Sequence, residues 1–156
     1  MLNIGSPAPD FELYDTDKQL VSLESLRGKT VLLLFFPLAF TSVCTKELCS
    51  VRDNIALYNS NNAEVFGISV DSTYALAKFK EEQKLNFSLL SDYNKTASAA
   101  YESLYEKFGN MVGVSKRSAF VIDRNGILQY MEVLENAGEV PNFEKIKNII
   151  ENQADK

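Results

Sequence analysis

The segment that decides the fold runs from Thr30 to Cys49 and reads TVLLLFFPLAFTSVCTKELC. Its first part, residues 30–36, is a continuous apolar run with β-branched and aromatic side chains, bounded by Gly28 and Pro37. This composition predicts a strand buried on both faces of a sheet. A helix is expected next, because apolar residues recur at helical spacing from Cys44 onward, namely Leu48, Val51, Ile55 and Tyr58.

Outside this segment, other strands and helices alternate with polar turns. Strands are predicted at 11–14, 19–22, 64–70, 87–90, 118–123 and 127–133, and helices at 73–84, 94–108 and 141–151. The first two strands form a hairpin, and the Asn125-Gly126 pair is a strong signal for a late hairpin. Strand–helix alternation between them indicates parallel crossovers. The predicted fold class is α/β: a thioredoxin-like fold in one domain, residues 1–156, with a central mixed sheet flanked by helices and an N-terminal β-hairpin.

The composition excludes several classes of function. With 46% hydrophobic residues and a formal net charge of −5, the chain suits a compact domain. This acidic balance, without a basic stretch of sequence, argues against nucleic acid and anionic membrane surfaces as partners. It has no histidine, which removes Ser-His and Cys-His nucleophiles and most zinc sites. A metalloenzyme is therefore not expected.

Cytoplasmic residence is the expected location. The N-terminus has no basic stretch followed by an apolar one, so no signal peptide is visible. The apolar run at 31–36 is too short to span a bilayer. Structural disulfides are rare in the cytoplasm, so Cys44 and Cys49 are expected to be free, metal-binding or catalytic.

Cys44 falls in the first turn of the predicted helix, with Thr41 or Ser42 as the expected N-cap. The unpaired backbone N–H groups and the dipole of a helix N-terminus favour an anion, and hence a reactive thiolate. Thr41 lies three residues earlier, where its hydroxyl can face the same sulfur or an oxygen bound beside it. The alternative is an inert Cys44 that packs as a small apolar side chain.

The same residues resemble a known family. Pro37, Thr41 and Cys44 match the P-x-x-x-T-x-x-C motif of peroxiredoxins, and Glu47 matches an acidic residue often found three positions after the cysteine. Most of the chain is covered, because three further segments are similar to other parts of these proteins: GSPAPDF at 5–11, FGISVDS at 66–72 and RSAFVID at 117–123. The combination of motifs is far more specific than the cysteine motif alone.

The resemblance implies a thiol-dependent peroxidase that reduces hydrogen peroxide and organic hydroperoxides without a metal or organic cofactor. Cys44 would attack the peroxide as a thiolate and become a sulfenic acid. Thr41 would hydrogen-bond the peroxide, Arg117 would hold thiolate and substrate, Pro37 would shield the sulfur, and Glu47 would orient an arginine. Without the resemblance, Arg117 would be read as an exposed charge ahead of a strand, and Glu47 as an ordinary first-turn glutamate.

Cys49 is the candidate resolving cysteine. On an intact helix it would lie about 140° around the axis from Cys44, with the Cα atoms roughly 8–9 Å apart. A disulfide needs Cα atoms closer than about 7 Å, so either Cys49 is inert or the helix must unwind after oxidation.

The family groups differ on this point. Q-type peroxiredoxins, which include the bacterioferritin comigratory proteins, are similar in having a resolving cysteine at this spacing. The segment FPLAFT at 36–41 looks more like that of E-type alkyl hydroperoxide reductases, which often lack one. The resemblance implies thioredoxin, or another thiol reductant, as partner, and a monomer or a homodimer.

Two other functions remain open at this point. A thioredoxin-like disulfide oxidoreductase would carry C-x-x-C, where this chain has C-x-x-x-x-C. It would also need a proline just before the late strand, where the chain has Ser115-Lys116-Arg117. A non-catalytic redox sensor would use the same thiolate, but would react once rather than turn over.

Overall fold

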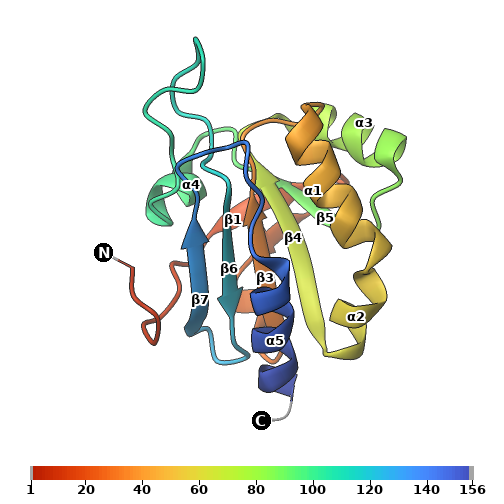
Figure 1. Cartoon of the computed structure of the whole chain (residues 1–156), viewed down its shortest axis with the longest axis vertical. Coiled ribbons are helices and arrows are strands. Elements are labelled where there is room, and N and C mark those ends of the chain that lie inside the picture. The colour runs from red at the N-terminus through yellow and green to blue at the C-terminus, as the bar shows by residue number, and fades with distance from the viewer. Residues whose placement is uncertain (1, 155–156) are drawn as a thin grey trace.

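A seven-stranded mixed sheet forms the centre of the computed structural model, which describes residues 2–154 (Figure 1). The strand order is β2-β1-β5-β4-β3-β6-β7. The strands are β1 (Glu12–Asp15), β2 (Leu20–Ser22), β3 (Thr30–Phe35), β4 (Ala63–Ser69), β5 (Ser88–Ser91), β6 (Ser118–Ile122) and β7 (Leu128–Val133). β3 pairs parallel with β4 and antiparallel with β6. The mixed sheet and its two hairpins confirm the predicted α/β, thioredoxin-like fold class.

The predicted buried strand, β3, lies in the middle of the sheet. Its residues are all buried, and Leu33 pairs with Phe66 of β4 on one side and Phe120 of β6 on the other. Because side chains alternate along a strand, Leu32 and Leu34 join the core on one face of the sheet, whereas Leu33 joins the core on the other. A strand covered on both faces needs a continuous apolar sequence rather than an alternating one.

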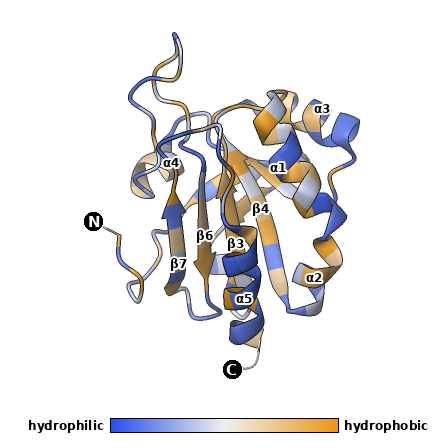
Figure 2. Ribbon diagram, viewed as in Figure 1, coloured by the Kyte–Doolittle hydropathy of each residue, from blue (hydrophilic) through white to orange (hydrophobic). Residues whose placement is uncertain are grey.

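Helices cover both faces of the sheet. One face carries α1 (Ser42–Asp53), α2 (Ile55–Ser60), α3 (Thr73–Gln83) and α5 (Phe143–Ala154). The other face is covered by α4 (Thr96–Ala100), the short 3-10 helix η1 (Glu24–Leu26) and the segment before β1. Apolar residues concentrate in the central strands, while α5 alternates between hydrophobic and hydrophilic residues along its length (Figure 2). Within residues 2–154, no helix has both the length and the apolar character needed to cross a bilayer.

Two predicted helices differ from the structure. The helix expected at 94–108 is wrong beyond its first turns, since α4 ends at Ala100 and Glu102 adopts a left-handed conformation with φ 53°. The chain then runs as a loop to β6, held by backbone hydrogen bonds such as Tyr105 N–H to the Val114 carbonyl. The single stripe expected from Cys44 to Tyr58 is divided into α1 and α2 at Asn54.

Candidate active site

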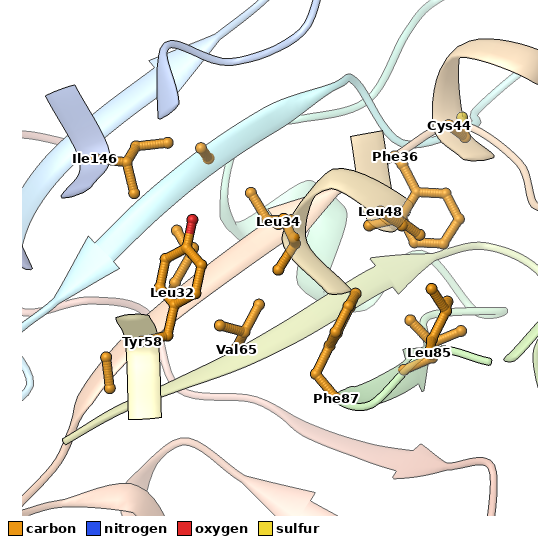
Figure 3. Packing of buried hydrophobic residues seen from close by; sticks show 14 of the residues in the cluster. Leu32, Leu34, Phe36, Cys44, Leu48, Tyr58, Val65, Leu85, Phe87 and Ile146 are labelled. Carbon is orange, nitrogen blue, oxygen red and sulfur yellow. The ribbon is translucent and has the colours of Figure 1, made fainter. Parts of the chain in front are cut away.

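Cys44 is the third residue of α1 and lies just beyond the carboxyl end of β3. Cys44 is only 1% exposed to solvent, and its thiol is not in a disulfide. Figure 3 shows it at one end of the apolar cluster, near Phe36 and Leu48. The packing thus keeps bulk water from the sulfur, while the first turn of a helix lies around it.

Arg117 reaches this sulfur from the neighbouring strand. β6 is antiparallel to β3, and its first residue, Ser118, pairs with Phe35 at the end of β3. Arg117, immediately before β6, is therefore brought beside the start of α1. Its Nη2 donates a hydrogen bond to Cys44 Sγ at 3.0 Å, and the arginine is 1% exposed. A buried cation in contact with the sulfur favours the thiolate form.

Glu47 forms the second contact of the same guanidinium. It lies three residues after Cys44, one helical turn along the same face. Arg117 Nη1 donates to Glu47 Oε1 at 2.7 Å, whereas Oε2 is buried without a hydrogen-bond partner among the described residues. Burial raises the pKa of Glu47 to about 7, although the charge and hydrogen bond of Arg117 act in the opposite direction. One guanidinium therefore serves two acidic groups in a dry site.

Two residues that the sequence analysis missed hold Arg117 from the other side. Its Nε donates to the Ala137 carbonyl at 2.9 Å, and its backbone N–H donates to the Tyr105 hydroxyl at 3.4 Å. That hydroxyl in turn donates to the Leu134 carbonyl at 2.9 Å. Burial would lower the pKa of Arg117, but Glu47 and Cys44 raise it above its ordinary value. The arginine is thus fixed in place and charged.

The loop between β3 and α1 carries Pro37 and Thr41. Pro37 is buried, and Thr41 occupies the N-cap position of α1. The expected side-chain cap is absent, because Thr41 Oγ1 donates instead to the Leu38 carbonyl at 2.9 Å. With its proton engaged in this way, the hydroxyl faces any further partner as an acceptor. Between them, Phe40 takes a left-handed conformation, with φ 67°.

Asp71 supports this loop and was also missed. It follows β4, and its Oδ2 accepts hydrogen bonds from Ala39 N–H at 2.8 Å and Ser69 Oγ at 2.6 Å. β4 pairs parallel with β3, so a polar residue just after its carboxyl end belongs to the same edge of the sheet as Cys44. The position of Asp71, just after a predicted buried strand, was the sequence signal that could have identified it.

Cys49 lies on another flank of α1. It is partly buried, and its Sγ contacts Gln83 Oε1 at 3.5 Å. Both cysteines are free, and α1 runs intact past both of them. The structure therefore brings Cys44, Glu47 and Arg117 into direct contact and leaves Cys49 outside that group.

Comparisons with known proteins show which family this chain resembles. The AhpC/TSA family model matches residues 4–131. Alkyl hydroperoxide reductase E of Mycobacterium bovis is 39% identical over 141 residues, which cover 90% of this chain and 90% of the relative. The chloroplastic peroxiredoxin Q of Oryza sativa subsp. japonica is 38% identical over 127 residues, covering 81% of this chain and 57% of the relative. The crystal structure of peroxidoxin BcpB from Mycobacterium tuberculosis has a TM-score of 0.85 at 30% identity, covering 97% of this chain and 98% of that one.

Proposed function

The chain belongs to the AhpC/TSA family and is a peroxiredoxin, a thiol-dependent peroxidase; from this premise we propose that Cys44 is the cysteine that attacks the peroxide. The observation that carries the proposal is the 3.0 Å contact from Arg117 Nη2 to Cys44 Sγ in a nearly water-free site. Cys49 Sγ instead donates to the Gln83 amide oxygen at 3.5 Å; Arg52 interacts with it electrostatically, but no described cation donates a hydrogen bond to this sulfur.

In the first step, the Cys44 thiolate attacks one oxygen of the peroxide. The sulfur–oxygen bond forms as the O–O bond breaks, giving Cys44 sulfenic acid and an alkoxide or hydroxide, which takes a proton and leaves as alcohol or water. Negative charge moves from sulfur onto the two oxygens. Arg117, already held by Glu47 and Ala137, donates toward that charge without having to reorganise.

The neighbouring residues orient the peroxide and protect the sulfur. Because the Thr41 proton is donated to the Leu38 carbonyl, its oxygen is available to accept from the O–H of the incoming peroxide. Pro37, buried in the loop after β3, shields the sulfur from water. Glu47 accepts a hydrogen bond from the Arg117 guanidinium and so keeps it directed at Cys44.

We propose Cys49 as the resolving cysteine. Its thiol attacks Cys44 sulfenic acid, the S–O bond breaks, and a disulfide and water form. The first turns of α1 must unwind for this step, since an intact helix keeps the two Cα atoms beyond disulfide range. A thioredoxin-like dithiol would then reduce the disulfide and return both thiols.

Other parts of the proposal concern substrate and setting. Hydrogen peroxide and organic hydroperoxides are the proposed substrates. The half-buried Leu38 and exposed Phe40 offer apolar surface beside the site, which suits the organic group of a hydroperoxide. A reducing cytoplasm suits two free cysteines. The protein is proposed to act as a monomer or a homodimer, with the whole chain, residues 1–156, as one domain.

Intact-mass spectrometry after one equivalent of hydrogen peroxide tests the proposal. The reduced wild-type protein should lose two mass units and yield a linked Cys44–Cys49 peptide. Cys49→Ser should instead gain sixteen units at Cys44, and Cys44→Ser should not change within the same time. A stable gain of sixteen mass units at Cys44 in the wild type would mean that an external thiol, rather than Cys49, resolves the sulfenic acid. No fast change at Cys44 would refute its proposed role.

Turnover with a reductant completes the test. Peroxide consumption coupled to thioredoxin, thioredoxin reductase and NADPH should proceed with the wild type and stop with Cys44→Ser. Failure with thioredoxin, together with turnover by a low-molecular-weight thiol, would overturn the proposed reductant while retaining the peroxidase.

A further inference from the structure

The loop from Pro37 to Thr41 is the part of the site that Arg117 does not hold. We propose that Asp71 is a positioning residue that keeps this loop in the shape a peroxide needs beside Cys44. The proposal rests on the proposed role of Cys44 in attacking the peroxide. Among the described hydrogen bonds and ion pairs, Asp71 contacts none of Cys44, Glu47 and Arg117, so it acts through the loop.

The two ends of one peptide group connect Asp71 to Thr41. The peptide between Leu38 and Ala39 presents its N–H to Asp71 Oδ2 at 2.8 Å and its carbonyl to the Thr41 hydroxyl at 2.9 Å. A peptide group is planar, so its N–H and C=O directions cannot change independently. Fixing the N–H therefore fixes the direction of the carbonyl that receives the Thr41 proton, and so decides which side of that hydroxyl is open to a peroxide.

Asp71 is itself firmly anchored to the sheet. Its Oδ2 accepts a hydrogen bond from the buried Ser69 hydroxyl at 2.6 Å, and the backbone N–H of Asp71 donates to Ser69 Oγ at 3.2 Å. Its backbone carbonyl accepts from Ser91 Oγ of β5 at 2.6 Å. The loop is thus tied to two strands rather than to another loop, which is the arrangement that gives a precise site.

The loop needs such a tie because its backbone is strained. Phe40 has φ 67°, a region that residues with a Cβ avoid, and its ring is half-exposed. The ring packs edge-on against Phe79 of α3, with centroids 5.2 Å apart. A strained conformation persists only where its surroundings over-determine it. Removing the Asp71 carboxylate would let the peptide rotate and Phe40 relax, while Cys44 and Arg117 stay in contact.

The test compares two electrophiles at Cys44 in Asp71→Ala, using Cys49→Ser as the common background. Hydrogen peroxide depends on the orientation of Thr41, whereas iodoacetamide needs only an accessible thiolate. We expect the second-order rate with peroxide to fall roughly 10- to 100-fold, as for a small misplacement of a reacting group. The rate with iodoacetamide should be unchanged or higher. Asp71→Asn keeps an acceptor oxygen and should restore most of the peroxide rate.

Ser72→Ala is the matched control. It removes the neighbouring N-cap bond of α3, from Ala75 N–H to Ser72 Oγ at 3.2 Å, and does not touch the loop. It should leave the ratio of the two rates at the wild-type value. The proposal is overturned if Asp71→Ala reacts normally with peroxide, if both rates fall together, or if Ser72→Ala changes the ratio equally.

Two further results separate the possible failures. A parent protein that reacts with peroxide no faster than free cysteine overturns the role of Cys44 as well, whereas a fast parent with an unaffected Asp71→Ala overturns this inference alone. Amide hydrogen exchange gives a test even if Asp71→Ala does not fold. The Ala39 amide of the wild type should be protected, and exchange at the rate of an unstructured peptide would overturn the proposal.

Discussion

Arg117→Met should separate the role of the guanidinium in the reaction from its role in the fold. Methionine is unbranched and apolar, so it fills much of the space but removes the donors to Cys44 Sγ, Glu47 Oε1 and the Ala137 carbonyl. Removing one preorganised donor from a developing charge costs about 10²–10³ in rate. We expect the second-order rate of Cys44 with peroxide to fall by at least that factor.

The same substitution should destabilise the protein. Glu47 is fully buried, and losing its cationic partner Arg117 costs about 3–5 kcal/mol at a pH high enough to keep the carboxylate ionised. Adding Glu47→Gln removes that charge and should recover most of the lost stability. It should not recover the reaction with peroxide, because the donor to the sulfur is still missing. The double variant therefore distinguishes a chemical role of Arg117 from a structural one.

Rapid chemical quench with intact-mass detection at pH 7 is the suitable assay, since the chain has no tryptophan to report oxidation by fluorescence. Circular dichroism and urea unfolding would follow stability. Lys116→Met is the control: its ammonium pairs with the exposed Glu135 and makes no contact with the sulfur. A folded Arg117→Met that reacts with peroxide within about threefold of the wild type, far short of the loss of one preorganised donor, would refute the reasoning.

Three other perturbations give separate checks. The pKa of Glu47 lies at about 7 in the folded protein against 4.5 without burial, so the folded state keeps this proton to a higher pH than the unfolded state. In a Cys44→Ser background, unfolding free energy should therefore fall by up to about 3 kcal/mol as pH rises between those values, and Glu47→Gln should abolish this dependence in urea titrations. Cys49→Ser should over-oxidise to the sulfinic acid at lower peroxide excess than the wild type, as seen by mass; equal sensitivity would argue against resolution by Cys49. Gly67→Ala would bring its Cβ to 2.7 Å from Leu89 Cδ2 and should cost about 1–3 kcal/mol in urea unfolding, a loss that a neutral result would contradict.

Much of the fold follows from local patterns in the chain. The apolar run of β3 was sufficient to predict a buried central strand, and the Asn125-Gly126 pair was sufficient to predict the β6–β7 hairpin. The helix expected at 94–108 shows where such patterns mislead. Tyr101 and Tyr105 have helical spacing, but their hydroxyls donate to the carbonyls of Pro9 and Leu134, which lie far away in the sequence. Those tertiary contacts override the local preference.

The candidate site divides in the same way. The position of Cys44 near the start of α1 follows from the strand, the loop and the apolar stripe around it. Arg117 does not follow from its surroundings in the sequence, because a charge ahead of a strand is usually exposed. Its buried partners Cys44 and Glu47 lie 73 and 70 positions away, and the antiparallel register of β6 is what joins them. Ala137 contributes only a carbonyl, which no residue pattern reveals.

The continuity of α1 past both cysteines links helix stability to redox energetics. A Cys44–Cys49 disulfide can exist only in a partly unwound helix, so every turn that is lost raises the free energy of the oxidised protein relative to the reduced one. In a two-electron couple, each 1.4 kcal/mol of this difference raises the reduction potential by about 30 mV. In the proposed cycle, oxidation by peroxide would therefore unwind part of α1, and reduction would allow it to refold. The same turn that places Cys44 beside Arg117 would then also make the proposed disulfide form easier to reduce.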